Sequence, residues 1–467
     1  MYTIPDRFFF RLHHVRPRFK TDIENVLIYI ATAISGISAL SKDQFAAEVN
    51  RAIRRFPGNL TKNTKTIDNW RTEISALFGF IEHDNLKKID KPSFLVHMLA
   101  KEQDLPQFFK YFLYLFQYPG GHLKPAESLK MIKTGIHFKP ARYILKLLKT
   151  GEKQTINRFY ITKDEATHCI FNDLRVTRDG RNVKDTILLM LDNRKNKVKY
   201  NSKGDVIRYA GDILDYMVIA NILVKHANKY FLNTQEKSII DKFIEDKSFF
   251  TPYNTLYAKR NLNINQIKAV QDKWFQYVNT DLGDNFFKTD VRKFIGISET
   301  DYHESINVSL QRFFQENREI KTKEIGDTGE NLVLGHECMK MKLAGKKDLI
   351  HLIKKIPDSF AMGYDILSCE IDEQKRYIEV KTTISLSRIN ANNFLMSTNE
   401  WLTAETNGDT YFIYRLIINK ESIRLLIIQN PVEKYKHNEL RMIPRKGAEI
   451  ILNENSSIKE ELLIWKD

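Results

Sequence analysis

The chain has 467 residues, which is enough for about two to four domains with separate hydrophobic cores. Its hydrophobic content of 42% is ordinary, no apolar run reaches the ~20 residues that a membrane span requires, and the N-terminus does not resemble a signal peptide. We therefore expect a cytoplasmic protein without membrane association. The net charge of +15 favours a polyanionic partner, above all nucleic acid, although a basic protein without such a partner has the same composition.

The cysteine and histidine content argues against a zinc site. Cys169, Cys338 and Cys369 are widely spaced, which fits a reducing compartment and excludes a cysteine-based site. The 12 histidines are scattered without an H-x-x-x-H pair, so a histidine-based metal site has no support either.

Changes in composition along the chain predict four segments. We expect two mainly helical modules, a helical linker and a C-terminal α/β domain, over residues 1–100, 101–250, 251–301 and 302–467 respectively.

The first module is predicted to contain two helices and a hairpin. Ser41 and Gln44 have capping-box spacing at the start of "SKDQFAAEVNRAI", and a turn rich in Pro, Gly and Asn follows. The next helix, "TIDNWRTEISALFGFI", carries an apolar face. A hairpin with the return strand "FLVHML" is expected to close the module. The apolar face consists of Ile67, Trp70, Ile74, Leu77 and Phe78.

The second module repeats this plan without repeating the sequence. Thr162 and Glu165 have capping-box spacing in "TKDEATHCIFNDL", and the helix "VKDTILLMLDNR" follows. A further helix lies in "GDVIRYAGDILDYMVIANI", and "LVKHANKYFLN" contains two short apolar runs around a turn, as expected for a wing.

Helix, helix and hairpin is the layout of a winged-helix module, in which the last helix enters the DNA major groove. Polar residues opposite an apolar stripe are also found on any solvated helix, and winged helices serve protein–protein contacts too. The DNA-binding candidates on the outward faces are Lys65, Asn69, Arg71 and Thr72 in the first module and Lys203 and Arg208 in the second. The aromatic run "QFFKYFLYLF" between the modules is expected to pack in a core rather than stack on bases.

The C-terminal segment is predicted to fold as helix, three strands, helix and strand, an αβββαβ arrangement with a mixed sheet. The helices cover "TGENLVLGHECMKMKLAG" and a segment starting near "STNEWLTAE". The strands are "YDILSC", "RYIEVKT" and "TYFIYRLII", followed by "SIRLLIIQ".

Charged residues in these apolar strands predict a catalytic site. Glu379 and Lys381 are two residues apart and therefore face the same side of a strand, and Asp365 can lie opposite them on the adjacent strand. Carboxylates in this arrangement suit Mg²⁺, and the lysine can stabilise developing negative charge. Glu330 on the preceding helix is our choice for a further ligand over Glu337, seven residues later.

A second acid near this site, Glu400, has an alternative explanation. Ser397 and Glu400 have capping-box spacing, so we expect Glu400 to begin a helix rather than to bind a metal.

The order G-x-D, a spacer and E-x-K resembles the PD-(D/E)XK nuclease superfamily. The segments "TGE", "GYDILS", "YIEVKTT" and "TNEWLTAETNGDTYFIYRL" are similar to the nuclease-like C-terminal domain named after NO VEIN, over roughly residues 305–430. The resemblance implies that Asp365 and Glu379 bind Mg²⁺, that Lys381 is the catalytic lysine and that Glu330 is the helix acid. Gly363-Tyr364 replaces the proline of the superfamily name.

A nuclease-like domain joined to two winged-helix modules resembles a type II restriction endonuclease that recognises one sequence and cuts at a distance, as type IIS enzymes do. This resemblance implies double-stranded DNA as substrate and Mg²⁺ as cofactor. One such site cuts one strand, so a double-strand break requires a homodimer, a second subunit or two successive events. The alternatives are a nuclease for modified or damaged DNA and a DNA-binding scaffold that does not cut.

Overall fold

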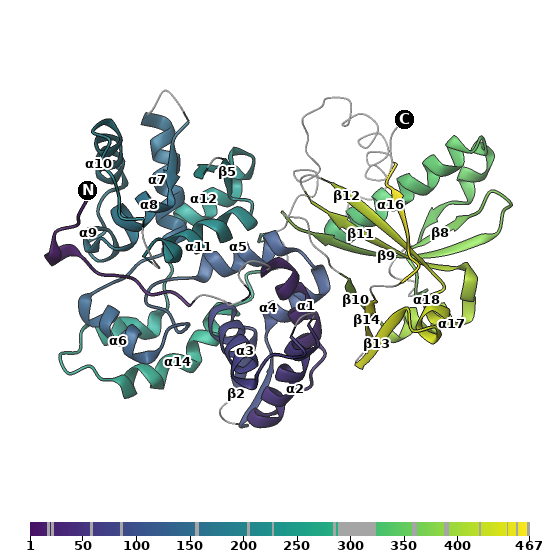
Figure 1. Ribbon diagram of the computed structural model, residues 1–467, viewed down its shortest axis with the longest axis horizontal. Helices are drawn as coiled ribbons and strands as arrows, with labels where there is room; N and C mark the ends of the chain where they lie inside the picture. The colour runs from purple at the N-terminus through teal and green to yellow at the C-terminus, as the bar shows by residue number, and fades with distance from the viewer. Residues whose placement is uncertain are drawn as a thin grey trace. The chain divides into compact units, whose positions relative to one another are not determined.

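The computed structural model describes residues 1–467 except 16–18, 20–22, 57–58, 85–86, 155–157, 203–205, 227, 284–285, 288–323, 357–361, 387–391, 420–421, 446, 454–455 and 465–467. The chain forms two compact units (Figure 1). The first contains residues 1–23, 38–95 and 106–283, and the second contains residues 24–37, 96–105 and 284–467. In the described ranges, no helix is long and apolar enough to cross a membrane.

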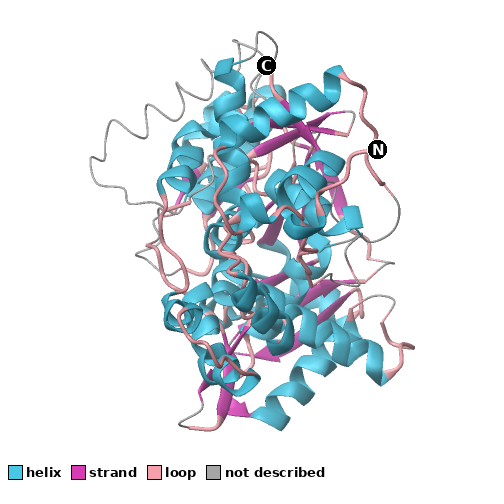
Figure 2. Cartoon of the chain, turned by 90° about the vertical axis from the view of Figure 1, so that its left-hand side faces the viewer, coloured by secondary structure: helices cyan, strands magenta, loops and turns pink. Residues whose placement is uncertain are grey.

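The first unit is mainly helical (Figure 2). Its longer helices are α2 (Lys42–Arg55), α3 (Thr64–Phe78), α5 (Leu105–Leu115), α6 (Pro125–Thr134), α7 (Pro140–Gln154), α10 (Val183–Lys195), α11 (Val206–Ile219), α12 (Lys237–Glu245) and α14 (Ile264–Val278). Short helices are η1 (Asp6–Phe8), α8 (Lys163–Ala166), a π-helical turn η3 (Thr167–Phe171), α9 (Leu174–Thr177), η4 (Thr234–Glu236), η5 (Thr251–Tyr253) and α13 (Asn254–Tyr257). The strands are β1 (Leu40–Ser41), β2 (Ile81–Asp84), β3 (Ile89–Pro92), β4 (Tyr160–Thr162), β5 (Leu223–His226) and β6 (Lys229–Leu232).

The predicted helix, helix and hairpin are present in the first module, as α2, α3 and the pair β2–β3. All five residues of the predicted apolar face of α3 are buried. The short strand β1 pairs with β3, so that the sheet has the order β1-β3-β2. Neither β1 nor its pairing with β3 was predicted, because a strand of two residues has no periodicity that a sequence pattern reveals.

Two details of the first module correct the sequence predictions. The return strand is β3, and the segment "FLVHML" instead begins helix α4 (Phe94–Glu102). Its buried residues Leu95, Val96, Leu99 and Ala100 recur at helical spacing. Ser41 precedes α2 without making the expected capping hydrogen bond, and its hydroxyl donates to the Gln44 side chain at 2.8 Å.

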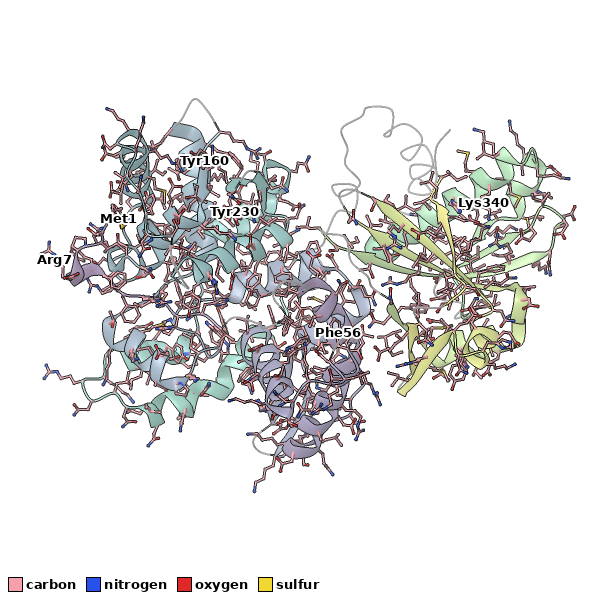
Figure 3. All side chains as sticks on the ribbon, in the orientation of Figure 1. Met1, Arg7, Phe56, Tyr160, Tyr230 and Lys340 are labelled. Atoms are coloured by element: carbon pink, nitrogen blue, oxygen red, sulfur yellow. The ribbon has the colours of Figure 1, made fainter. Side chains whose placement is uncertain are left out.

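The second module has a sheet of equivalent order, β4-β6-β5. The predicted capping box is complete here, since Thr162 accepts from the Glu165 N–H and the Glu165 carboxylate accepts from the Thr162 N–H. Tyr160 on β4 and Tyr230 on β6, labelled in Figure 3, lie on the two strands that pair. In both modules a short strand therefore leads directly into a helix and pairs with the later hairpin.

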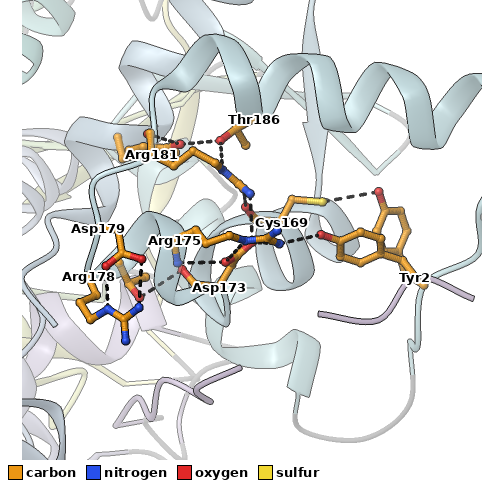
Figure 4. A network of polar contacts seen from close by, with 11 residues as sticks. Tyr2, Cys169, Asp173, Arg175, Arg178, Asp179, Arg181 and Thr186 are labelled. Atoms are coloured by element: carbon orange, nitrogen blue, oxygen red, sulfur yellow. Dashed lines mark hydrogen bonds and ion pairs between the residues drawn. The ribbon is translucent and has the colours of Figure 1, made fainter. Parts of the chain in front are cut away.

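A buried aspartate organises the turn that precedes α10 (Figure 4). Asp173 is fully buried and accepts from the Arg175 side chain at 2.8 Å, and its other oxygen lies 3.1 Å from Arg181. Arg181 also donates to the Cys169 carbonyl at 2.7 Å. These two arginines therefore neutralise an internal carboxylate as well as adding to the net positive charge.

The aromatic run of α5 packs in the core of the first unit, as predicted. Phe108, Phe109 and Phe112 are buried, and the Phe112 ring centroid lies 5.2 Å from that of Phe78 on α3. Helix α14, in the segment expected to be a linker, is likewise folded into this unit, where Trp274 is buried in a hydrophobic cluster.

The second unit contains the predicted mixed sheet. Its helices are α1 (Ile23–Ser35), most of α4, α16 (Glu324–Leu343), η7 (Lys347–Leu352), α17 (Thr398–Asn407), η9 (Gly408–Thr410) and α18 (Pro431–Lys436). Its strands are β7 (Lys354–Lys355), β8 (Ile366–Cys369), β9 (Lys375–Ile384), β10 (Asn393–Met396), β11 (Tyr411–Ile418), β12 (Ile423–Gln429), β13 (Leu440–Arg445), β14 (Gly447–Leu452) and β15 (Lys459–Leu462).

The main sheet has the order β15-β12-β11-β9-β8-β7, and within it β9 and β11 are parallel while the other pairs are antiparallel. The four predicted strands are present as β8, β9, β11 and β12, but α17 lies between β9 and β11, so two of these strands rather than three precede that helix. A second sheet, β10-β14-β13, was not predicted. Helices α16 and α17 lie on opposite sides of the main sheet (Figure 1). Gly329 permits the close approach of α16 to β9, because a Cβ at this position would collide with the Thr382 side chain.

Candidate active site

The hairpin of β8 and β9 holds Asp365 beside the middle of β9. The Asp365 N–H donates to the Ile378 carbonyl at 2.9 Å, which fixes the backbone just before β8. The N–H of Val380, the residue between Glu379 and Lys381, donates to Asp365 Oδ2 at 2.8 Å. The Asp365 carboxylate therefore lies against β9 at the position of these two residues. The predicted position of Asp365 across from the E-x-K strand is therefore observed.

Glu379 and Lys381 project from the same side of β9, as their spacing predicts. Lys381 Nζ donates to Glu379 Oε1 at 2.7 Å, and Glu379 is only 5% exposed. Lys381 Nζ also donates to Glu400 Oε2 at 2.9 Å. The ammonium thus lies between two carboxylates on one face of the sheet.

Glu400 caps α17, as the sequence predicts, and it also contacts Lys381, which the sequence analysis did not predict. Its capping box with Ser397 is present, with the Ser397 hydroxyl accepting from the Glu400 N–H and the Ser397 N–H donating to Glu400 Oε2. The same oxygen contacts Lys381. A capping acid on a helix that follows an E-x-K strand was the available signal, because the start of α17 lies over the face that carries Lys381.

Glu330 and Glu337, the two acids considered on α16, have different surroundings. Glu330 Oε2 lies 2.8 Å from Lys355 Nζ on β7, and the charge of Glu330 acts on Asp365. Glu337 is fully buried and accepts from the Ser368 and Tyr414 hydroxyls, both at 2.7 Å. Glu337 therefore belongs to a buried polar network, whereas Glu330 is electrostatically coupled to the site.

The carboxylates of the site oppose one another's ionisation. Burial and the charge of Glu330 raise the pKa of Asp365 to about 7. Burial also raises the pKa of Glu379 well above its usual range; Lys381 opposes this effect and Asp365 reinforces it. Burial disfavours the charged form of Lys381, but Glu379 and Glu400 raise its pKa above the ordinary value. When the carboxylates of Asp365, Glu379 and Glu400 are all ionised, their negative charge therefore exceeds the single positive charge of Lys381.

The carboxylates of Asp365, Glu379 and Glu330 are chemically suited to bind a hard divalent cation. The side chains are oxygen donors, the ligands that Mg²⁺ prefers, and a cation would relieve the repulsion that raises the pKa values of Asp365 and Glu379. Among the described residues, no three His, Cys, Asp or Glu side chains converge closely enough to form a ready metal site. Lys381 lies between two of the carboxylates instead.

The DNA-binding candidates of the first module differ in their exposure and in their contacts within the module. Lys65 is exposed on α3, and Asn69 is half-buried. Arg71 lies 3.3 Å from Asp68 and also donates to the Ala46 carbonyl, so it is held against the module. The exposed Thr72 donates its hydroxyl to the Asp68 carbonyl at 2.8 Å.

In the second module, Arg208 is exposed on α11, as its predicted role requires. Lys203 lies outside the described residues. The structure thus leaves Lys65 and Arg208 as the exposed basic candidates on the last helix of each module.

Comparisons with known proteins match both parts of the chain. Residues 2–275 match the family model "Restriction endonuclease BpuJI - N terminal", and residues 329–428 match "Protein NO VEIN, C-terminal". No curated protein matches the chain.

Solved structures agree for the N-terminal part. The BpuJ1 endonuclease binding domain, crystallised in complex with pyrene- and phenanthrene-modified DNA, matches 58% of this chain and 98% of its own at 24% identity and a TM-score of 0.52, which indicates a shared fold. The restriction endonuclease FokI bound to DNA aligns over 77% of this chain and 72% of its own at 12% identity, but its TM-score of 0.22 is too low to indicate a common overall fold. Because the first family model covers more than half of the residues, the chain belongs to the restriction endonuclease family represented by the BpuJI N-terminal region.

Proposed function

We propose that the chain is a sequence-specific DNA endonuclease of type II that hydrolyses a phosphodiester bond with Mg²⁺-activated water. The observation that carries this proposal is that Asp365, just before β8, lies against β9 beside Glu379 and Lys381, with Lys381 bridging Glu379 and Glu400. Charged groups at such burial are costly unless they are paired, and their uncompensated negative charge is typical of functional sites. We assign the second unit to the PD-(D/E)XK superfamily on this basis.

Asp365, Glu379 and Glu330 are the residues that would hold the metal. Bound there, Mg²⁺ would supply Lewis acidity, lowering the pKa of water and neutralising charge on the phosphate. The ionised forms of these carboxylates are required for this role, and the raised pKa of Asp365 makes cation binding and deprotonation mutually dependent.

Lys381 would stabilise the negative charge that develops on the phosphate in the transition state, a role that does not depend on the metal. Attack of water on phosphorus places additional negative charge on the phosphoryl oxygens before the P–O bond breaks. An ammonium held by Glu379 and Glu400 stays charged, because both carboxylates raise its pKa. Such a preorganised charge stabilises the transition state without reorganisation, an effect of about 10²- to 10³-fold for one donor.

Sequence recognition is assigned to the two modules of the first unit as winged helices. Their common order of short strand, helices and hairpin supports this assignment, as does the net charge of +15. The similar BpuJ1 domain was crystallised with modified DNA. We propose α3 and α11 as the groove-facing helices and double-stranded DNA as the substrate.

The test is incubation of the purified protein with plasmid and phage DNA, with Mg²⁺ or with EDTA. Glu379→Ala and Lys381→Ala are the inactivating variants. Exposed Glu405 on α17, whose carboxylate accepts from the Trp401 indole at 2.8 Å, supplies the control Glu405→Ala. We expect discrete Mg²⁺-dependent fragments from the wild type and from Glu405→Ala, and none from the other two variants. DNA binding measured in EDTA should persist in Lys381→Ala.

Other results separate the alternatives. Nicked circles alone would indicate that a second subunit or a dimer is needed for double-strand cleavage. Binding without cleavage of unmodified DNA, followed by cleavage of modified DNA, would replace sequence-specific restriction by modification-dependent activity. Binding without any cleavage would indicate a DNA-binding scaffold. Loss of DNA binding in Lys381→Ala would assign a structural role to Lys381.

A further inference from the structure

Two stretches from the N-terminal family region belong to the second unit and contact the distal end of β9. Residues 24–37 include Glu24, whose carboxylate accepts from the Ser385 hydroxyl just after β9. Residues 96–105 include Gln103, whose carbonyl accepts from the Ile384 N–H at 3.3 Å. The strand that carries Glu379 and Lys381 therefore ends against two segments that are remote from it in the sequence.

Gln103 contacts the end of β9 through both its backbone and its side chain. It lies between α4 and α5, is 5% exposed, and has a left-handed backbone with φ of 49°, which is unusual for glutamine. Its side-chain oxygen accepts from the Thr383 hydroxyl and from Arg415 Nη2, the latter at 2.9 Å. A strained backbone that presents one buried acceptor to two donors is a specific arrangement rather than a loose packing contact.

Arg415 connects Gln103 to the backbone of the catalytic strand. It is fully buried on β11, opposite Lys381 in the parallel pairing of β9 and β11. Arg415 Nη1 donates to the Lys381 carbonyl at 3.1 Å, and Nη2 donates to Gln103 Oε1. The hydrogen-bond acceptors described for Arg415 are neutral oxygens, so its orientation depends on their positions.

We propose that Gln103 is a positioning residue for catalysis, which through Arg415 fixes the backbone of Lys381. The inference rests on the proposed nuclease function and extends it to a residue outside the nuclease-like sequence. Helix α5 begins two residues after Gln103 and continues into the first unit, so the residue that contacts β9 is followed directly in the chain by a helix of that unit. A shift of ~1 Å in such supporting geometry can cost about 100-fold in rate.

The experiment compares Gln103→Met, which keeps the length of the side chain but removes the acceptor, with Gln103→Glu, which keeps an acceptor for Arg415. Ser385→Ala is the matched control, because it breaks the contact with Glu24 and leaves the path to Lys381 intact. Single-turnover cleavage of plasmid DNA in Mg²⁺, DNA affinity in EDTA and the melting temperature are measured on the full chain. We expect Gln103→Met to cut about 10- to 100-fold more slowly with unchanged DNA affinity, and Gln103→Glu to recover most of that rate. Ser385→Ala should cut at a rate near that of the wild type.

The inference is overturned if Gln103→Met cuts as fast as the wild type, if Gln103→Glu is as slow as Gln103→Met, or if Ser385→Ala is equally slow. Should Gln103→Met not accumulate as folded protein, Gln103→Asn, which withdraws the acceptor by one methylene, replaces it with the same expected loss. A wild-type protein that binds DNA but does not cut would refute the proposed function, and this inference with it. A cutting wild type with an equally active Gln103→Met refutes this inference alone.

Discussion

Glu400 has two roles that point mutations can separate, because its carboxylate both caps α17 and contacts Lys381. Glu400→Gln keeps an oxygen that can accept from the Ser397 N–H but removes the charge next to the ammonium. We expect the cleavage rate to fall by about 10- to 100-fold with little change in melting temperature, as for loss of an electrostatic contact in an active site. Single-turnover cleavage and thermal unfolding of the same preparation measure both quantities.

Ser397→Ala provides the converse change. It removes the hydroxyl that accepts from the Glu400 N–H, at an expected cost of about 1 kcal/mol in stability, while the Lys381 contact remains. Its cleavage rate should stay near that of the wild type. If both variants lose activity in proportion to their loss of stability, Glu400 acts only as a helix cap.

The raised pKa of Asp365 predicts how stability depends on pH in the absence of metal. Its folded-state pKa of about 7 exceeds the ordinary value of 3.8, so the folded protein binds this proton more tightly than the unfolded chain does. The contribution of Asp365 to stability is therefore most favourable below pH 3.8 and becomes unfavourable as the pH rises to about 7. Asp365→Asn removes the charge and should stabilise the protein at pH 8 by about 2 kcal/mol, while abolishing cleavage.

Urea unfolding in EDTA at several pH values measures this effect. The advantage of Asp365→Asn over the wild type should be large at pH 8, shrink between pH 7 and pH 4, and shrink at pH 8 when Mg²⁺ is added to the wild type. A variant that is less stable than the wild type at pH 8 would show that ionised Asp365 stabilises the fold.

Individual residues of the site were predictable where a short-range pattern fixes them. The period of two along a strand places Glu379 and Lys381 on one face, and the short hairpin brings Asp365 to them. Gln103 and Arg415 could not be predicted, because their contact joins positions that are hundreds of residues apart and neither lies in a chemical motif.

At the scale of elements, the same distinction between local and distant information holds. The apolar strands β8, β9, β11 and β12 and the capped helix α17 carry local signals, and the structure contains them where the sequence predicts. Strand β10 pairs with β14, far along the chain, and no local pattern specifies that partner. The "FLVHML" segment was assigned to a strand because its residue types suit one, but burial at helical spacing decides for α4.

The helices α3 and α11 yield a prediction about DNA binding. Lys65 and Arg208 are exposed on them, and each would neutralise about one phosphate if these helices face DNA. We expect Lys65→Ala and Arg208→Ala each to weaken DNA binding and to reduce the magnitude of the slope of log K against log salt by about 1. Binding in EDTA across a range of salt concentrations measures the slope.

Lys130 is the matched control, since it is exposed and paired with Glu127 at 3.0 Å but lies on α6 rather than on α3 or α11. Lys130→Ala should leave the slope near the wild-type value. If all three variants behave alike, the binding reflects overall charge, and α3 and α11 are not the helices that contact DNA.

At the scale of the whole molecule, the net charge of +15 does not translate directly into a DNA-binding surface. Arg194 pairs with Glu165 at 2.6 Å and Arg181 pairs with Asp173, both inside the second module. Arg415 is buried on β11. Composition therefore predicts the class of partner, whereas the contacts decide which basic residues remain exposed to it.

The second unit contains two segments from the N-terminal part of the chain, and this composition predicts the behaviour of a truncated chain. A fragment of residues 284–467 contains all the predicted catalytic residues but lacks Glu24 and Gln103. Ser385, Thr383 and Arg415 would then lose hydrogen-bond acceptors that are buried in the intact chain. Each buried polar group left unsatisfied costs about 1–3 kcal/mol, against a total stability of about 5–15 kcal/mol for a domain.

We therefore expect the 284–467 fragment to unfold with low cooperativity and not to cleave DNA, even though its nuclease-like sequence is complete. Hydrogen exchange followed by mass spectrometry locates the defect, because the Ile384 amide donates to the Gln103 carbonyl in the intact chain and loses this acceptor in the fragment. Protection should therefore be lost first at the C-terminal end of β9. A fragment that melts cooperatively and protects this end of β9 as the full chain does would show that residues 24–37 and 96–105 contribute little to the second unit.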